Sequence, residues 1–237
     1  MAGAGLWAFV GASSLILGAI IALSGRLKGL PLVLLIGFGC GALISALAYD
    51  LIEEAVAVSA TGLSVASGFV AGALAYYGGD ALIERMPGAD ASDGGGGLPI
   101  LLGAVLDGIP ESIVLGLTLV GGAGPSVAIL VAIFISNVPE SVASSTRMLA
   151  SGRRPVWVIG VWTLVAIASA AAAAIGYGLF ANASGDVIAF IDAFAAGAIL
   201  TLLADSLLPA AHAEANRLVG LATSAGFAVA AFLSLSA

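Results

Sequence analysis

The chain consists largely of apolar stretches, each long enough to cross a lipid bilayer, and this feature restricts its fold more than any other. A transmembrane helix needs about 20 mostly apolar residues. Eight such stretches occur, separated by short breaks with turn residues, at 6–24, 31–57, 63–85, 98–120, 126–150, 156–180, 187–210 and 218–236. We therefore predict an all-α polytopic membrane protein, a single transmembrane domain over residues 1–237 with eight transmembrane helices.

The composition excludes several classes of protein. Of the 237 residues, 61% are hydrophobic and 9% are charged, whereas soluble domains are about 45–50% apolar and about 25% charged. A soluble enzyme and a disordered chain are therefore excluded. Seven Lys+Arg residues cannot form the basic surface that nucleic acids need, so we expect no nucleic-acid partner. The single Cys40 excludes an internal disulfide and a thiolate cluster.

The basic residues predict how the chain is oriented in the membrane. All seven fall in or beside the breaks that follow the first, third, fifth and seventh stretches, at Arg26, Lys28, Arg85, Arg147, Arg153, Arg154 and Arg217. Basic residues mark the cytoplasmic side, so both termini are expected to be extracytoplasmic and 86–97 is a short cytoplasmic loop. No basic residue precedes the first stretch, which favours a retained helix over a signal peptide. We expect a multi-pass protein of the bacterial inner (cell) membrane.

Two pairs of segments resemble each other in opposite orientations. Residues 38–45 align with 194–201, and the match continues through Leu47/Leu203 and Leu51/Leu207. Residues 108–112 and 137–141 share a Pro-Glu-Ser sequence. Together they predict an inverted 3+2+3 pseudo-symmetry, which is typical of secondary transporters. Chance similarity between helices rich in Ala, Gly and Leu remains the alternative, more so for the first pair than for the second.

Three carboxylates, Asp107, Glu111 and Glu140, lie near the centres of their spans. A charge at that depth costs about 2.5–3.5 kcal/mol on insertion scales, and no Lys or Arg lies nearby in the spans to pair with it. Asp107 and Glu111 are four residues apart, and Asn137 and Glu140 three apart, so each pair shares a helix face. A bound cation or protons would compensate the charge; a structural hydrogen-bonded pair between packed helices is the alternative.

Prolines add backbone oxygens to the same region. Pro110 and Pro139 each remove the hydrogen-bond donor for a carbonyl one turn earlier. Loosened carbonyls and carboxylates on two kinked helices are expected to meet near the membrane centre. We predict an oxygen-rich cation site formed by Asp107, Glu111, Asn137 and Glu140, with Ser136 and Ser112 as further oxygen donors.

The segments 107–111 and 136–140 resemble the paired motifs of the ZIP family of zinc- and iron-regulated metal transporters, whose fourth helix reads His-Asn-x-Pro-Glu. The resemblance implies eight helices, a metal site between helices four and five, and uptake toward the cytoplasm. Only Glu111 and Glu140 match without change. Asp107 replaces the histidine, Gly108 the asparagine, and Ser136 the leading ligand of the second motif.

The types of ligand atom indicate which metal ions we expect the protein to transport. Oxygen ligands suit Mn(II) and Fe(II), whereas zinc sites usually include imidazole or thiolate; the family resemblance nevertheless keeps zinc first. We expect one divalent cation, held weakly as substrate, and no prosthetic group. Carboxylates that hold protons when no metal is bound would make transport depend on pH.

Further polar residues have a functional and a simpler interpretation. Asp50, Glu53 and Glu54 form a cation-concentrating entrance or a solvated helix end. Asp205 and His212 form an exit relay or are merely solvated, and Ser141 and Ser144 line an exit path or bond to their own helix. The GxxxG pairs Gly37/Gly41 and Gly68/Gly72 pack helices within the chain or in a homodimer.

Two other functions compete with metal transport. A ZIP-like protein that has lost transport could serve as a sensor, a scaffold or a carrier of another solute. A membrane enzyme such as an intramembrane aspartyl protease is least favoured, because 77–80 reads Tyr-Gly-Gly-Asp and lacks the required Gly-x-Gly-Asp spacing. We therefore expect that the protein is not an enzyme.

Overall fold

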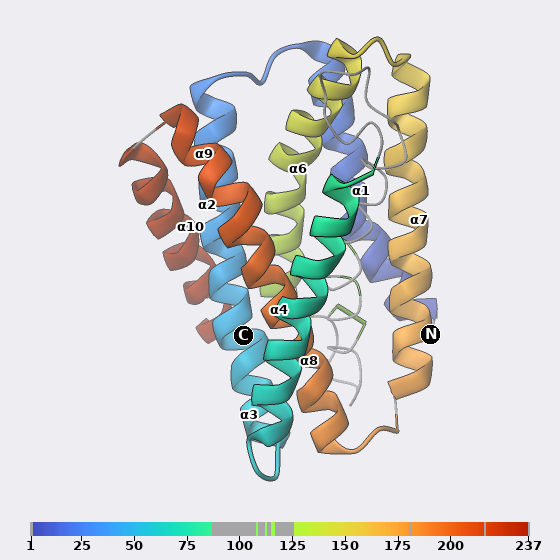
Figure 1. Cartoon of the computed structure of the whole chain (residues 1–237), viewed down its shortest axis with the longest axis vertical. Coiled ribbons are helices and arrows are strands. Elements are labelled where there is room, and N and C mark those ends of the chain that lie inside the picture. Colours follow the sequence, from blue (N-terminus) through green and yellow to red (C-terminus); the bar gives the residue numbers. More distant parts are fainter. Residues whose placement is uncertain are drawn as a thin grey trace.

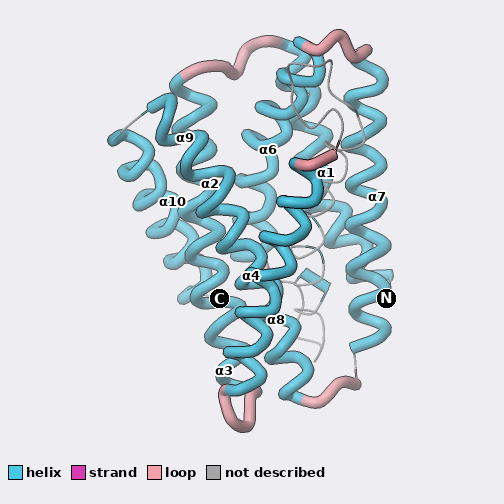
Figure 2. The backbone as a smooth tube through the Cα atoms, viewed as in Figure 1, coloured by secondary structure: helices cyan, strands magenta, loops and turns pink. Residues whose placement is uncertain are grey.

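The three-dimensional structure is a computed structural model that describes residues 2–86, 126–180, 182–215 and 217–236, together with Gly108, Ser112, Leu115 and Gly116. Within these residues every regular element is a helix (Figure 2). The predicted span at 98–120 lies outside the described residues except for those four positions, and so do Asp107, Pro110 and Glu111.

Seven helical rods make up the described part of the chain. Two of them are composite: α2 (Leu30–Ala46), the π-helix η1 (Leu47–Ile52) and α3 (Glu53–Val58) form one, and α8 (Gly185–Leu202), the π-helix η3 (Leu203–Leu207) and α9 (Leu208–Ala215) form the other. The remaining five are α1 (Ala2–Ser24), α4 (Leu63–Glu84), α6 (Val127–Ala150), α7 (Pro155–Phe180) and α10 (Arg217–Ser236). They pack lengthwise into one bundle (Figure 1).

Six of these rods are long and apolar enough to cross a membrane, which makes the chain a multi-pass integral membrane protein. They correspond to the stretches predicted at 6–24, 31–57, 126–150, 156–180, 187–210 and 218–236, so these six predictions are confirmed as helices. The stretch predicted at 63–85 is also helical as α4, but it is not among the six. Its second half contains Tyr76, Tyr77 and Asp80, which lower its hydropathy.

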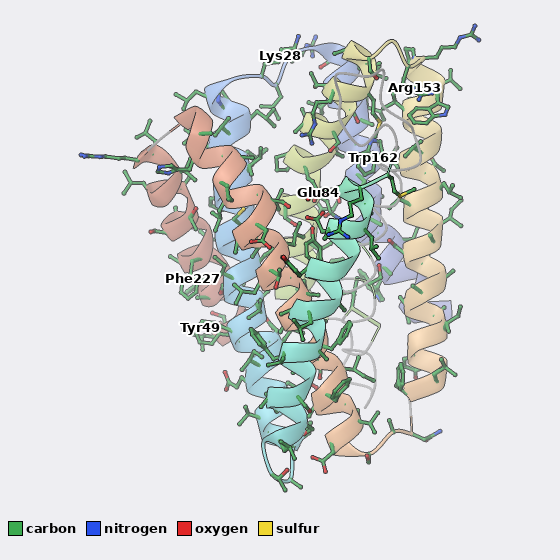
Figure 3. All side chains as sticks on the ribbon, viewed as in Figure 1. Lys28, Tyr49, Glu84, Arg153, Trp162 and Phe227 are labelled. Carbon is green, nitrogen blue, oxygen red and sulfur yellow. The ribbon has the colours of Figure 1, made fainter. Side chains whose placement is uncertain are left out.

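The basic residues gather at one end of the bundle. Figure 3 shows Lys28, in the α1–α2 connection, and Arg153, in the α6–α7 connection, at the same end of the molecule. Arg147 lies in the last turn of α6, Arg85 caps α4 and Arg217 begins α10. The connections at the opposite end, 59–62 and 182–184, contain no Lys or Arg. The chain directions therefore agree with those that the charge pattern predicts.

Glycines allow two helix pairs to approach closely, and they do so in the same way. In the α2–α10 pair, a Cβ on Gly41 would lie 1.8 Å from the Thr223 carbonyl oxygen, and one on Gly226 would lie 1.9 Å from the Phe38 oxygen. In the α8–α4 pair, a Cβ on Gly197 would lie 2.1 Å from the Phe69 oxygen, and one on Gly72 would lie 1.8 Å from the Phe194 oxygen. Each glycine thus faces the carbonyl three residues before its partner glycine.

This correspondence agrees with the alignment of 38–45 with 194–201, since Phe38 matches Phe194 and Gly41 matches Gly197. Both GxxxG pairs also pack against helices of the same chain. A Cβ added to Gly37 would contact Val219 of α10, and one added to Gly68 would contact Phe190 of α8. In the described structure these glycines therefore pack helices within one chain.

The two π-helices begin at matched positions, Leu47 and Leu203, each six residues after the glycine of its close contact. The sequence alignment pairs these same leucines, but an apolar run gives no sign that one extra residue is inserted in a turn. π-Helical turns widen a helix locally and occur often at functional sites. Here each π-helix contains an acid, Asp50 in η1 and Asp205 in η3.

The helices α1, α6 and α7 share a second hydrophobic cluster around Trp162. This side chain is 1% exposed and lies in a cluster with Leu15, Met148 and Val165 (Figure 3). Its indole N–H donates to the Ser145 hydroxyl at 2.7 Å, which ties α7 to α6. The cluster holds the central part of α6 in a fixed position beside α1.

Candidate cation site

Helix α6 carries the described half of the predicted cation site. Ser126 caps the helix by accepting a hydrogen bond from the Ile129 N–H at 3.2 Å. The helix continues without a break through the buried Pro139. Asn137 and Glu140, three residues apart, therefore lie on one face, as predicted. Asn137 is 5% exposed.

Asn137 and Glu140 line a small cavity between α1, α6, α7 and the segment around Gly108. Its volume of about 20 Å³ has room for one water molecule or one ion. Four polar side chains border it: Ser112, Asn137, Glu140 and Ser169. The rest of the lining is glycine and apolar, with the small Ala8 and Ala12 of α1 leaving the space open: Ala8, Ala12, Leu15, Gly108, Leu115 and Ile133.

The polar lining offers only oxygen donors and one amide nitrogen. A carboxylate, an amide oxygen and hydroxyls are ligands that suit hard and borderline divalent cations. Asp107 and Glu111, the other predicted ligands, lie outside the described residues. Within the described part of the chain, no three His, Cys, Asp or Glu side chains come together closely enough to hold a metal.

Ser169 of α7 is a polar contributor that the sequence analysis did not identify. It is 5% exposed and lines the cavity opposite α6. A Cβ on Gly108 would lie 3.3 Å from its hydroxyl oxygen, so glycine at this position allows the serine to come close. The signal in the sequence was a single hydroxyl inside the Ala-rich run 166–174.

Ser136 lies on a different face of α6 from the cavity. Its hydroxyl donates to the Ile133 carbonyl at 3.0 Å. A Cβ on Gly39 would lie 2.8 Å from the Ser136 Cα, which shows how closely α2 approaches α6 there. Among the described contacts, Ser136 therefore serves helix packing.

Two serines predicted along an exit path also make local bonds. The Ser141 hydroxyl donates to the Val138 carbonyl at 3.1 Å and faces Gly18 of α1. Ser144 accepts a hydrogen bond from the Arg147 guanidinium at 3.3 Å. The simpler interpretation, bonding within their own helix, fits both.

An apolar layer lies on the side of the cavity away from the bundle end that carries Lys28 and Arg153. Side chains of α2, η1, α6 and α8 enclose a space of about 10 Å³ with a purely apolar lining: Leu43, Ala46, Leu47, Leu51, Ile129, Ile133 and Ile199. Ile133 borders both spaces. This layer therefore lies between the Asn137–Glu140 pair and the two glutamates of α3, Glu53 and Glu54.

Asp50 lies in η1 between Leu47 and Leu51, two residues that line this layer. Its two carboxylate oxygens accept hydrogen bonds from Ser126 at 3.1 Å and from Ser234 at 2.8 Å, so it joins η1 to α6 and α10. The ring of the neighbouring Tyr49 contacts Phe227 of α10, with centroids 6.1 Å apart (Figure 3). Glu53 and Glu54 follow on α3 and are exposed.

At the other end of the bundle, Asp205 in η3 and His212 in α9 are both exposed. No described contact joins them to the cavity. Their solvated interpretation is the one that this placement favours.

Asp192 of α8 is a second residue that the sequence analysis missed. It is 3% exposed, and its Oδ2 has no hydrogen-bond partner in the described structure. The signal was an acid within the apolar run 187–210, between Ile191 and Ala193.

No protein-family model and no curated protein matches this chain.

Proposed function

We propose that the chain is a ZIP-like transporter that carries divalent transition-metal ions toward the cytoplasm, zinc first, with Fe(II) and Mn(II) as further cargo. One observation carries the proposal: Asn137 and Glu140 share an ion-sized cavity with two serine hydroxyls, inside a bundle of membrane-spanning helices. A charged side chain within a membrane costs free energy, and such residues mark ion pathways in membrane proteins.

The full proposed topology has eight spans, with 63–85 and 98–120 added to the six apolar helices, and both termini outside. The one-sided basic residues support this orientation. The matched glycine contacts of the α2–α10 and α8–α4 pairs support the inverted 3+2+3 pseudo-symmetry, as do the matched π-helices. Transporters of this kind place substrate sites at the interface between their repeats.

The proposed ligands are Asp107, Glu111, Asn137 and Glu140, with Ser112 and Ser169 supplying hydroxyl oxygens beside them. A volume of about 20 Å³ around the described members supports one ion rather than two. The Glu140 carboxylate would balance the ion's charge and the Asn137 amide oxygen would complete part of its shell. Protons on the carboxylates would take the ion's place after it leaves.

The apolar layer gives the site one closed side. Leu47, Leu51, Ile129 and Ile133 separate the cavity from the outer end of the bundle. A transporter must expose its site to one side at a time, and a layer of packed apolar side chains can block a hydrated ion. We infer that the arrangement described here is closed toward the outside.

The same cavity suits a ZIP-like protein that binds a cation without moving it, such as a sensor. A purely oxygen and amide lining without histidine favours this second function, since the ZIP motif has histidine where Asp107 stands. Binding and transport therefore have to be measured separately.

Uptake of zinc, iron and manganese into metal-starved cells tests the proposal. We expect the wild type to raise uptake of at least one metal above empty-vector cells, and Glu140→Gln, which removes the charge with little change in shape, to lower it more than tenfold. Glu84→Gln, an exposed acid at the end of α4, is the matched control and keeps wild-type uptake. Equal membrane levels of all variants are checked by immunoblot.

If well-expressed wild type takes up none of the three metals, transport is rejected. Binding of a metal by the purified protein, lost in Glu140→Gln but without any uptake, would establish the sensor or scaffold function instead.

A further inference from the structure

Asp192 is a buried acid that is not among the proposed ligands of the midplane site. It is 3% exposed, and its Oδ2 is one of two buried side-chain polar atoms without a hydrogen-bond partner in the described part of the chain. A buried carboxylate that lacks a partner is strongly unfavourable unless something compensates it. A native protein that retains such a group usually has a ligand, ion or proton for it.

The surroundings of Asp192 bring a second carboxylate close. Ala189 and Ala193, on the same face of α8, pack against the fully buried Ala55 of α3. Glu54 is the residue before Ala55, so its backbone lies beside this α3–α8 contact, and its negative charge acts on Asp192. Glu54 is itself exposed. One acid thus faces the interior of the α3–α8 contact and the other reaches the surface beside it.

No cationic side chain is available to compensate this pair. All seven Lys and Arg residues lie at the C-cap of α4 or in or beside the connections α1–α2, α6–α7 and α9–α10, and none lies in η1, α3 or α8. The single histidine, His212, is in α9. Asp50, one helical turn before Glu54, adds further negative potential. The α3–α8 contact therefore combines like charges with an unsatisfied oxygen.

We propose that Asp192 and Glu54 form a second cation site, on the outer side of the apolar layer, which takes a divalent metal ion between the two carboxylates. Cation binding at this site is independent of the proposed transport function. The site's role as an intermediate binding site before the midplane cavity rests on that function. With two carboxylates and water as ligands, the site binds weakly and releases its ion readily. Oxygen ligands of this kind suit Mn(II) well.

The proposed Asp192–Glu54 site lies where an ion could bind before it reaches the midplane cavity. Ser126 of α6 contacts Asp50, and Ser136 of α6 contacts Gly39 at the level of the cavity. Ser126 and Ser136 are ten positions apart, which corresponds to about 15 Å along the helix. Glu54 lies one turn farther out than Asp50. An ion at Asp192 and Glu54 is therefore held beyond the apolar layer, on the outer approach to Glu140.

Titration of the purified full-length protein in detergent with Mn(II), with free Mn(II) measured by electron paramagnetic resonance, tests the site. We expect two ions on the wild type. Asp192→Asn and Glu54→Gln should each weaken one of them more than tenfold and leave the other. Asp186→Asn is the matched control, because Asp186 is an acid in the first turn of the same helix that bonds to Ser64 and to the Ala60 N–H; it should bind both ions as the wild type does.

Unchanged binding in both Asp192→Asn and Glu54→Gln would overturn the proposal and assign a proton to Asp192. Glu54 is exposed, so Glu54→Gln remains informative even where Asp192→Asn fails to fold, and wild-type binding in that variant alone would reject the site. Failure of the proposed function has a different signature: Glu140→Gln would retain both ions, while the effects of Asp192→Asn and Glu54→Gln persist.

Discussion

Gly226→Ala is predicted to destabilise the bundle because the glycine lets α10 touch the backbone of α2. The added Cβ would lie 1.9 Å from the Phe38 carbonyl oxygen, whereas ordinary contacts begin near 3.4 Å. The helices must therefore separate by about 1.5 Å, since a backbone atom cannot turn away as a side chain can. Overpacking of this kind costs about 1–3 kcal/mol, and we expect the upper half of that range.

Gly220→Ala provides the matched control. Gly220 lies in the same helix, and no described heavy atom lies within 4 Å of its added Cβ. Both substitutions gain the same helix propensity, about 1 kcal/mol, so their difference isolates the clash. A difference of about 2–3 kcal/mol corresponds to a melting temperature roughly 4–12 °C lower for Gly226→Ala than for Gly220→Ala in a chain of this size.

The assay is thermal unfolding of the purified variants in one detergent, followed by the loss of the monodisperse peak in gel filtration. Gly72→Ala and Gly78→Ala repeat the comparison in α4, where a Cβ added to Gly72 would lie 1.8 Å from the Phe194 oxygen and one added to Gly78 would have no heavy atom within 4 Å. Similar penalties in both pairs follow from their matched geometry. Equal melting temperatures for Gly226→Ala and Gly220→Ala would refute the close approach of α2 and α10.

Two further predictions concern packing and orientation. Trp162→Phe removes the indole hydrogen bond to Ser145 and leaves that fully buried hydroxyl without its donor, so it should lower the free energy of unfolding by about 1–3 kcal/mol. In the control Trp157→Phe, the native ring lies 4.8 Å from the Arg153 guanidinium at the end of the bundle, and its replacement should lower the free energy of unfolding by less than about 1 kcal/mol. Equal melting temperatures for the two variants would contradict the difference in burial. In a Cys40→Ser background, an impermeant maleimide added to intact cells should label Thr61→Cys but not Lys28→Cys, because these residues lie at opposite ends of the bundle; the reverse pattern would invert the proposed orientation.

Hydropathy predicted the six apolar helices that are long enough to cross a membrane, because length and apolarity are what a spanning helix requires. The predicted stretch 126–150 and the helix Val127–Ala150 differ by one residue at the start. The internal similarity of 38–45 and 194–201 also predicted which glycines would be equivalent in the helix contacts. The π-helices at Leu47 and Leu203 were missed, because an inserted residue in a helical turn changes no hydrophobic pattern.

The site was harder to predict because a helix has more than one polar face. The three-residue spacing correctly placed Asn137 and Glu140 together, but it could not show that Ser136 faces Gly39 of α2 instead. Ser169 and Asp192 were overlooked because each is a single polar residue in an apolar run. Only the packing of α7 on the Gly108 segment, and of α8 on α3, shows that these two side chains are buried beside other polar groups.

The central claim is that a metal ion crosses the membrane through the cavity beside Asn137 and Glu140. The most direct test is metal flux into liposomes that contain the purified protein and a metal-sensitive dye, with zinc, iron and manganese added separately outside. The account predicts flux of at least one metal with the wild type and with Glu84→Gln, and a loss of more than tenfold with Glu140→Gln. Equal flux through the wild type and Glu140→Gln would contradict it.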